Sequence, residues 1–331
     1  MPVALDLAGY SGRVNRVIDH VESLLWGQSL GVSLEAAAQR AHFAPTHFHK
    51  VFRAVTGHAF ADYVRVQRLR QAASIFLAAP RSSVLDVAFQ CGFGSGEAFA
   101  RAFRRAYGMS PSDWRAGGHV AYRRALLVEH QRTRRPLVPV GGMGPLLPDP
   151  DPDKLRVFSP ELGFPEHLAL QSADTSPVRV EHRPALRIAY FRVRGAYGDH
   201  VGPFWAWCLR RCEALGLESE GREFVGVWLD DPSMVPVQDC RHDVGIVLRA
   251  GEVAPREVPV REVAAHDYLI YPIDDIVGRV DHVWRWLLAV WMPRNGLAHG
   301  YAPGYERLRR SGLHGGDGRL QGELCVPVRL R

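Results

Sequence analysis

The sequence predicts two domains: an all-α domain of two helix-turn-helix units, followed by an α+β domain of two pseudo-symmetric strand-helix-strand-strand repeats. Three observations support this fold class. One repeat, with an offset of 50 to 51 residues, occupies the first third of the chain, and a fainter repeat, with an offset of 80 residues, occupies the second half. The charge also divides unevenly between the two parts.

The composition is that of a globular protein long enough for two domains, with 331 residues, 47% hydrophobic and 23% charged. Residues 1–135 contain 18 Lys and Arg against 9 Asp and Glu, a net charge of +9, whereas the remainder has a net charge of −3. A basic part joined to a mildly acidic part indicates that the first part meets a polyanion.

The first repeat predicts two matched helix-turn-helix units. Residues 33–43 match residues 83–93, and residues 45–57 match residues 96–108, with phenylalanines, basic residues and a closing glycine in register. The segment between them, residues 60–78, has apolar residues at helical spacing and predicts one connecting helix.

Start and stop signals agree with these helices. Ser83 with Asp86 has the pattern of a capping box, Ser95 is suited to cap the following helix, and Pro45 suits a first turn. Residues 110–113 start a further short helix. Glycines suited to end helices follow three of the segments: Gly57, Gly92 and Gly108.

The second helix of each unit has an apolar stripe on one side and polar residues on the other. The polar residues are Thr46, His49, Lys50 and Arg53 in the first unit, and Glu97, Arg101, Arg104 and Arg105 in the second. In a helix-turn-helix the second helix lays this face in the DNA major groove. The alternative is a pair of solvated amphipathic helices with a surface ion pair between Glu97 and Arg101.

Residues 13–116 resemble the AraC/XylS DNA-binding domain, on the run Cys91-Gly-Phe-Gly-Ser95 and the ending Gly108-Met-Ser-Pro111-Ser-Asp-Trp114-Arg115. The resemblance implies seven helices, with two recognition helices in successive major grooves. The base-reading positions it implies are Thr46, His49, Lys50, Gly96, Glu97, Ala98 and Arg101. Since Gly96 and Ala98 cannot donate to a base edge, we expect the second unit to hold mainly phosphate through its arginines.

The expected boundaries are a DNA-binding domain over 1–118, a linker over 119–175 and a second domain over 176–331. Residues 119–135 are suited to continue as an exposed basic helix. Residues 138–154 are rich in Pro and Gly and predict an extended tether.

The second repeat aligns residues 188–195 with 268–275, residues 225–227 with 305–307, and residues 243–246 with 323–326. Each copy has the order strand, Trp-rich helix, strand, strand. Two such copies predict an antiparallel sheet with helices on one side and a groove between the halves. The expected helices contain these aromatic residues: Phe204, Trp205, Trp207, Trp284, Trp286 and Trp291.

Residues 176–331 resemble the GyrI-like effector-binding domain, on the segments 187–195, 227–232 with 240–243, and 322–328. The resemblance implies a carboxylate, here Glu306, in an aromatic pocket for cationic lipophilic ligands. After Glu306 the usual Asn-Asp-Pro turn is missing and three arginines follow, so the alternative is a strand residue paired to Arg307 or Arg309. The expected ligand-binding residues are Glu306, Tyr190, Phe204, Trp207, Trp228, Tyr268 and Trp284, with core packing as the alternative for each tryptophan.

The favoured function is a ligand-responsive transcription regulator, an activator that senses lipophilic cations and contacts RNA polymerase. One alternative is a GyrI-like hydrolase that uses a Glu and a Tyr in one cleft. Tyr305 and Glu306 are adjacent, so they point to opposite faces of a strand and another tyrosine would have to serve. The other alternative is an architectural DNA binder. We expect no catalytic residue and no cofactor.

The remaining features predict a cytoplasmic protein without a metal site. The five cysteines are odd in number and scattered, so buried reduced thiols are favoured. The N-terminus has neither a basic region nor a long apolar run, and no stretch is long enough to span a membrane. Because one chain contains two readers, a monomer suffices for two grooves about 10 bp apart.

Overall fold

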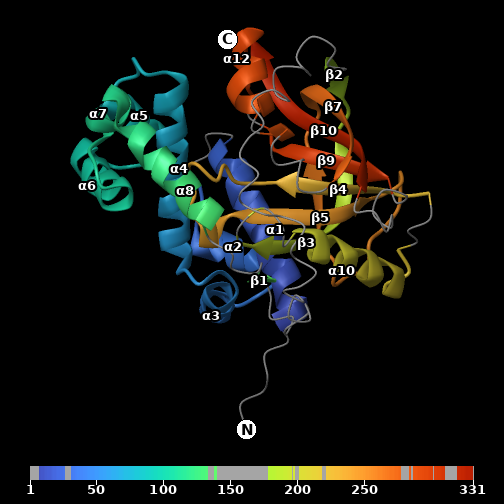
Figure 1. Cartoon of the computed structure of the whole chain (residues 1–331). Coiled ribbons are helices and arrows are strands. Elements are labelled where there is room, and N and C mark those ends of the chain that lie inside the picture. The colour runs from blue at the N-terminus through green and yellow to red at the C-terminus, as the bar shows by residue number, and fades with distance from the viewer. Residues whose placement is uncertain are drawn as a thin grey trace. The chain divides into compact units, whose positions relative to one another are not determined.

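The structure is a computed structural model that describes residues 7–26, 31–132, 138–139, 178–195, 197, 201–217, 221–276, 283–284, 286–300, 302–309 and 319–330. The chain forms two compact units (Figure 1). The first is built on residues up to Thr133, and the second contains the sheet and the helices that go with it.

The first compact unit is helical, and it confirms the two predicted helix-turn-helix motifs and the helix between them. Helices α2 and α3 form the first motif, and α5 and α6 form the second. The helices are α1 Leu7–Trp26, α2 Leu34–Arg40, α3 Pro45–Thr56, α4 Phe60–Ala78, α5 Val84–Gln90, α6 Gly96–Tyr107, α7 Pro111–Asp113, a π-helical turn Trp114–Gly118, and α8 His119–Arg132.

Local signals set the ends of these helices. The Ser83 and Ser95 hydroxyls each accept a hydrogen bond from the backbone N–H three residues later. The glycines that end α3 and α6, Gly57 and Gly108, have φ values of +78° and +72°, which L side chains rarely adopt. The reciprocal bond of a capping box is present at Ser110 and Asp113, at the start of α7.

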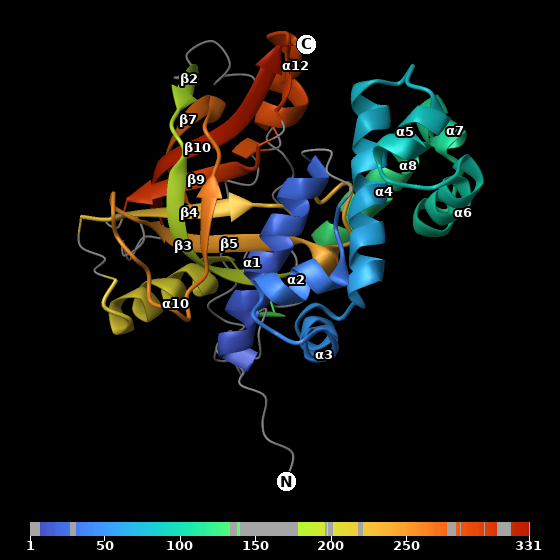
Figure 2. The ribbon, with the colours of Figure 1, turned by 180° about the vertical axis from the view of Figure 1, so that it is seen from behind.

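Helix α4 is the spine of this unit, with α3 near its N-terminal end and α6 beside its C-terminal half (Figures 1 and 2). At one end the Phe60 ring packs against Phe48 and Phe52 of α3. At the other end the Phe76 ring packs against α6. Trp114 is fully buried and donates its indole N–H to the Ala73 carbonyl oxygen at 3.3 Å. Helices α3 and α6 are therefore both packed onto α4.

Helix α8 also belongs to the first unit. Its Tyr122 ring lies 5.3 Å from the Tyr107 ring and 5.4 Å from the Trp114 ring. The predicted tether lies outside the described residues, except Val138 and Pro139, which form β1 and pair with β3.

The second unit is an antiparallel sheet with the strand order β1-β3-β5-β4-β9-β10-β7-β2 (Figure 2). In addition, β6 pairs with β3 and β8 pairs with β10. The strands are β2 Arg179–Arg183, β3 Leu186–Arg194, β4 Glu223–Trp228, β5 Arg241–Val247, β6 Val260–Val263, β7 His266–Ile276, β8 Leu297–His299, β9 Gly304–Arg309 and β10 Arg319–Leu330. The helical segments are α10 Val201–Ala214, a 3-10 turn Val237–Asp239, a π-helical turn Leu287–Trp291 and α12 Met292–Arg294.

The predicted strand-helix-strand-strand repeats are present. One copy is β3, α10, β4 and β5, and the other is β7, the helical residues Trp284, Trp286 and Leu287–Arg294, β9 and β10. Strands β4 and β9 lie next to each other at the centre of the sheet, so an approximate twofold axis passes between them.

Each copy also has an additional first strand, which pairs with the other copy. Strand β2 precedes β3 but pairs with β7, whereas β6 precedes β7 but pairs with β3. Val180 lies opposite Leu269, and Val260 lies opposite Ala189. These two pairs are equivalent, because Val260 and Leu269 follow Val180 and Ala189 by the offset of 80 residues. The repeat therefore starts earlier in the sequence than residues 188 and 268.

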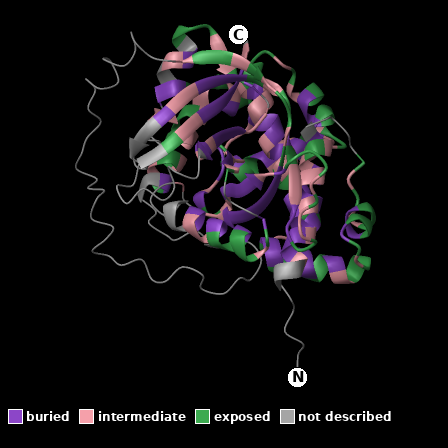
Figure 3. Ribbon diagram, turned by 90° about the vertical axis from the view of Figure 1, so that its right-hand side faces the viewer, coloured by how far each residue is buried: buried purple, intermediate pink, exposed green. Residues whose placement is uncertain are grey.

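The two faces of the sheet have different contents. One face has a cluster that includes Tyr190, Tyr268 and Tyr305, each at most 1% exposed. The opposite face is covered by α10 and by the tryptophans of the second helical region. Figure 3 shows buried residues along the central strands.

Candidate functional site

The outward face of α3 contains the predicted DNA-binding residues of the first helix-turn-helix motif. Thr46, His49, Lys50 and Arg53 are all exposed. The opposite side of the helix is buried in the core through Phe48, Val51, Phe52 and Val55. The structure therefore brings all four predicted residues together on one accessible surface, which we call the first reading face.

The outward face of α6, the second reading face, contains Glu97, Arg101, Arg104 and Arg105, all exposed. The Arg101 Nη1 and Glu97 Oε2 atoms are 3.7 Å apart, and their side chains are 75% and 88% exposed. An exposed pair of this kind contributes about 0 to 1 kcal/mol, so it does not compete strongly with a phosphate. Gly96 and Ala98 are half-buried in the first turn of the helix.

The second unit places Glu306 on the helix-covered face of the sheet, at its centre. Glu306 is 3% exposed, and its Oε1 accepts a hydrogen bond from the Trp284 indole N–H at 3.1 Å. Arg307 is on the other face, where it donates to Glu223. The carboxylate thus lies beside an aromatic ring, and its neighbour Arg307 has another partner.

Two glycines let indole rings approach this face closely. A Cβ atom at Gly226 would lie 2.5 Å from Cζ2 of Trp205, and one at Gly304 would lie 2.7 Å from Cη2 of Trp284. Gly226 is the direct partner of Glu306 across β4 and β9. Trp205 therefore lies against the sheet next to the carboxylate, although its sequence position did not single it out from other helix tryptophans.

Trp228 is on the same face and stacks on a buried histidine. The Trp228 and His242 ring centroids are 4.1 Å apart with an interplanar angle of 10°. His242 is fully buried, and burial lowers its pKa to about 3. Neither ring nitrogen of His242, nor the indole nitrogen of Trp228, has a hydrogen-bond partner among the described residues. No sequence signal had marked His242 as a candidate.

The other predicted ligand-binding residues divide between the faces. Phe204 and Trp207 of α10 stack with centroids 5.9 Å apart, and Trp207 packs against Phe191 on the helix-covered face. Tyr190 and Tyr268 lie on the opposite face, because the register places them with Tyr305 and not with Glu306. The structure therefore does not bring these two tyrosines to Glu306.

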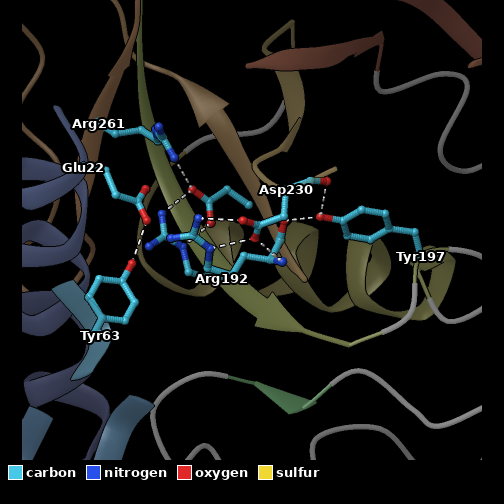
Figure 4. Close-up of polar contacts among 8 residues, drawn as sticks. Glu22, Tyr63, Arg192, Tyr197, Asp230 and Arg261 are labelled. Atoms are coloured by element: carbon cyan, nitrogen blue, oxygen red, sulfur yellow. Dashed lines mark hydrogen bonds and ion pairs between the residues drawn. The ribbon is translucent and has the colours of Figure 1, made fainter. Parts of the chain in front are cut away.

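Two ion clusters lie on the tyrosine face at matching positions of the repeats. In the first, Asp243 of β5 accepts from Arg192 at 2.6 Å and from Arg261 at 2.8 Å, and the Asp243 and Arg192 side chains are fully buried (Figure 4). In the second, Glu323 of β10 accepts from two arginines of β2, Arg179 and Arg183. In both clusters the strand exchanged between the copies supplies arginine.

A third ion pair lies at the end of β4. Arg241 donates to both carboxylate oxygens of Asp230 at 2.8 and 2.9 Å, and the Tyr197 hydroxyl lies 2.8 Å from the Arg241 carbonyl oxygen (Figure 4). Such a bidentate pair fixes the chain where it leaves the sheet.

The cysteines and other metal-ligating residues form no second site in the described part of the chain. All five cysteines are buried and none of them forms a disulfide, as the sequence predicted. Burial raises the pKa of Cys91, Cys212 and Cys325 to about 12. Among the described residues, no group of three or more His, Cys, Asp or Glu is placed to hold a metal ion. In the same residues, no helix has the length and apolar character needed to cross a bilayer.

Comparison with known proteins matches both units. The profile of a helix-turn-helix domain matches residues 37–117, and that of the GyrI-like small molecule binding domain matches residues 176–329. The chain is 31% identical over 84 residues to the regulatory protein SoxS of Escherichia coli (strain K12), covering 25% of this chain and 78% of SoxS.

Two further relatives match the helical unit. The uncharacterized HTH-type transcriptional regulator YbfP of Bacillus subtilis (strain 168) is 34% identical over 106 residues, covering 32% of this chain and 35% of YbfP. The chain thus spans about a third of the length of that relative. The DNA-binding domain of AdpA, solved in complex with a target DNA, is 32% identical, with 34% of this chain and 94% of that chain covered and a TM-score of 0.28.

Two helix-turn-helix motifs on one spine thus precede a two-repeat sheet that matches a small-molecule-binding domain, a combination typical of transcription regulators. The chain belongs to the AraC family of transcriptional regulators, and its C-terminal domain is GyrI-like.

Proposed function

We propose that this regulator activates transcription in response to a lipophilic cation, which binds on the helix-covered face of the sheet against Glu306. The observation that carries the proposal is the carboxylate itself, 3% exposed and in contact with the Trp284 indole. Burial disfavours an ionised carboxylate, and an entering cation favours it. Aromatic faces add cation–π attraction of about 0.5 to 2 kcal/mol each.

The proposed effector site consists of Glu306 with the aromatic residues of its own face: Trp205, Phe204, Trp207, Trp228 and Trp284. Tyr190 and Tyr268 are left out of it because they lie on the other face. Of the tyrosines that the hydrolase alternative could use, Tyr190 and Tyr268 lie on the face opposite Glu306, as Tyr305 does.

On the DNA side, we propose that the first reading face reads bases and the second mainly holds phosphates. The first has hydroxyl, imidazole and ammonium groups at Thr46, His49 and Lys50. The second has Arg101, Arg104 and Arg105, whereas Gly96 and Ala98 offer no hydrogen-bonding side chain. A monomer on two successive grooves in the cytoplasm, in contact with RNA polymerase, completes the proposal.

The effector proposal is tested with two ligands of nearly the same shape and opposite charge. Tetraphenylphosphonium should quench the tryptophan fluorescence of the full chain and bind, whereas tetraphenylborate should bind much more weakly. Glu306→Gln keeps the shape of the side chain and removes its charge. It should weaken tetraphenylphosphonium by about 10- to 100-fold, which corresponds to a charge-assisted contact of about 1.5 to 3 kcal/mol.

Two outcomes would contradict the effector proposal. One is equal affinity for the phosphonium and the borate. The other is a Glu306→Gln variant with unchanged phosphonium affinity. The activator role is tested separately by transcription in vitro from a promoter with a selected binding site, where tetraphenylphosphonium should raise the yield of transcript with the wild-type protein and not with Glu306→Gln.

A further inference from the structure

Helix α5 has an apolar surface beside the start of the second recognition helix. Leu85 and Phe89 lie one turn apart and are each 49% exposed, while Val87 and Ala88 face the core. Half-exposed large apolar side chains next to an interface are candidates for contact with the partner of that interface. Here the adjoining interface is the second reading face.

Leu85 occupies the space beside Gly96 that a side chain at that position would need. The Cδ1 atom of Leu85 is 3.1 Å from the place of a Cβ atom on Gly96. Gly96 is the first residue of α6, directly after the N-cap Ser95. A methyl group supplied by α5 therefore lies directly beside the place that the first side chain of α6 would take.

The first residues of a recognition helix contact base edges. A base edge can be read without a hydrogen bond, because an apolar side chain recognises the C5-methyl group of thymine in the major groove. Since Gly96 has no side chain, the apolar group nearest to it determines what this part of α6 presents to DNA. We infer that Leu85 reads a thymine methyl group in the major groove that α6 enters.

The first helix-turn-helix unit provides an internal comparison. At the offset of 50 residues, the residue that corresponds to Leu85 is Glu35, which is exposed on α2. A carboxylate cannot make an apolar contact with a methyl group. The first unit instead has hydrogen-bonding side chains on its reading face, such as His49 and Lys50. The two helix-turn-helix motifs therefore read DNA by different chemistry, with hydrogen bonds in the first motif and a methyl contact in the second.

The experiment removes single methyl groups from DNA. Binding sites are selected from random duplexes with the full chain. Each thymine in the part of the site contacted by the second helix-turn-helix motif is then replaced in turn by 2′-deoxyuridine, which lacks only the methyl group. At one position this should weaken wild-type binding about fourfold, corresponding to about 0.8 kcal/mol for one buried methyl or methylene group. Placing 5-methylcytosine at that position should restore more affinity than cytosine does.

Leu85→Ala should bind the thymine and deoxyuridine sites equally, since it has no side chain left to meet the methyl. Phe89→Ala is the matched control, because Phe89 is equally exposed and has no atom within 4 Å of the Gly96 Cβ position. It should keep the wild-type methyl dependence. Thermal unfolding of both variants verifies that these half-exposed residues are not needed for folding.

The inference rests on the proposed placement of α6 in a major groove, and the outcomes separate the two. A thymine preference without methyl dependence, or a methyl dependence that persists in Leu85→Ala, would overturn the role of Leu85 alone. A selected site with no base preference in its second part would overturn this inference and leave α6 as a holder of phosphates, whereas unchanged DNA affinity in Arg104→Ala and Arg105→Ala would overturn the placement of α6 on DNA.

Discussion

Gly226 and Glu306 are direct partners across the two central strands of the sheet, and each has the same position in its own repeat. The approximate twofold axis thus relates a residue without a side chain to a buried carboxylate. On one side of the axis the Trp205 ring fills the space, and on the other the carboxylate meets Trp284. The proposed effector site therefore has a single charge from two related halves.

We expect Gly226→Ala to destabilise the second unit by about 1 to 3 kcal/mol, the usual cost of overpacking. The added methyl would lie 2.5 Å from Trp205 Cζ2 and 2.9 Å from His242 Nε2, so at least one ring must move. Urea unfolding followed by tryptophan fluorescence measures the loss. Trp205→Phe removes the atom that clashes, and the double variant should recover part of the stability. No recovery would mean that the clash is with another group.

The buried histidine should make the second unit sensitive to acid. Burial lowers the pKa of His242 to about 3, whereas the unfolded chain binds that proton near pH 6.5. Between these values the unfolded state binds more protons, so stability should fall as the pH decreases, by up to about 1.4 kcal/mol per pH unit.

His242→Phe keeps a ring against Trp228 and cannot titrate. Its unfolding free energy should therefore decrease less than that of the wild type between pH 6.5 and pH 4, and the two should run parallel above pH 7. Denaturant titrations at several pH values measure the difference. Parallel curves over the whole range would show that His242 is not the acid-sensitive group.

The two matched ion clusters should differ in their contribution to stability. Asp243→Asn leaves Arg192 buried with a weakened partner, and we expect a loss of about 3 to 5 kcal/mol. Glu323 is 26% exposed, and Glu323→Gln should cost no more than about 1 kcal/mol, as for exposed pairs. Both variants are compared by urea unfolding. Equal losses would indicate that burial does not separate the two clusters.

The two reading faces should respond differently to substitution. Lys50→Ala and His49→Ala should relax the base preference of the first helix-turn-helix motif, by about 1 to 3 kcal/mol for each base contact. Arg104→Ala and Arg105→Ala should weaken binding to all sequences alike and lower the salt dependence, by about one unit of log–log slope per lost phosphate contact. Selection from random DNA and titrations at several salt concentrations measure both. The reverse pattern would contradict the assignment.

The helical unit could be predicted in detail because its signals are local. Caps such as Ser95, left-handed glycines such as Gly108 and the phenylalanine spacing act within a few residues of where they stand. The predicted connecting helix, residues 60–78, has the bounds of α4. The contact between Leu85 and Gly96 was beyond reach, because it depends on the packing angle of two helices.

The sheet could be predicted in its repeat and in the order of elements along the chain, but not in which residues share a face. The predicted ligand site joins Tyr190 and Tyr268 to Glu306, yet the register of the strands places both tyrosines on the other face. His242 was missed because nothing local in the sequence shows that a ring lies under Trp228. Arg261 of β6 donates to the Asp243 carboxylate, and this contact depends on a strand pairing that the repeat alone does not reveal.

The exchange of β2 and β6 between the two copies has a consequence for how the effector domain is made. Neither copy can complete its own sheet, since Val180 needs Leu269 and Val260 needs Ala189. A nascent chain therefore holds an unpaired β2 edge until the first five residues of β7, His266–Ile270, have been synthesised. Long-range pairing of this kind folds slowly and late. We therefore expect the domain to unfold as a single cooperative unit, and we expect a gene truncated after the first copy to encode a chain with an open sheet edge prone to aggregation.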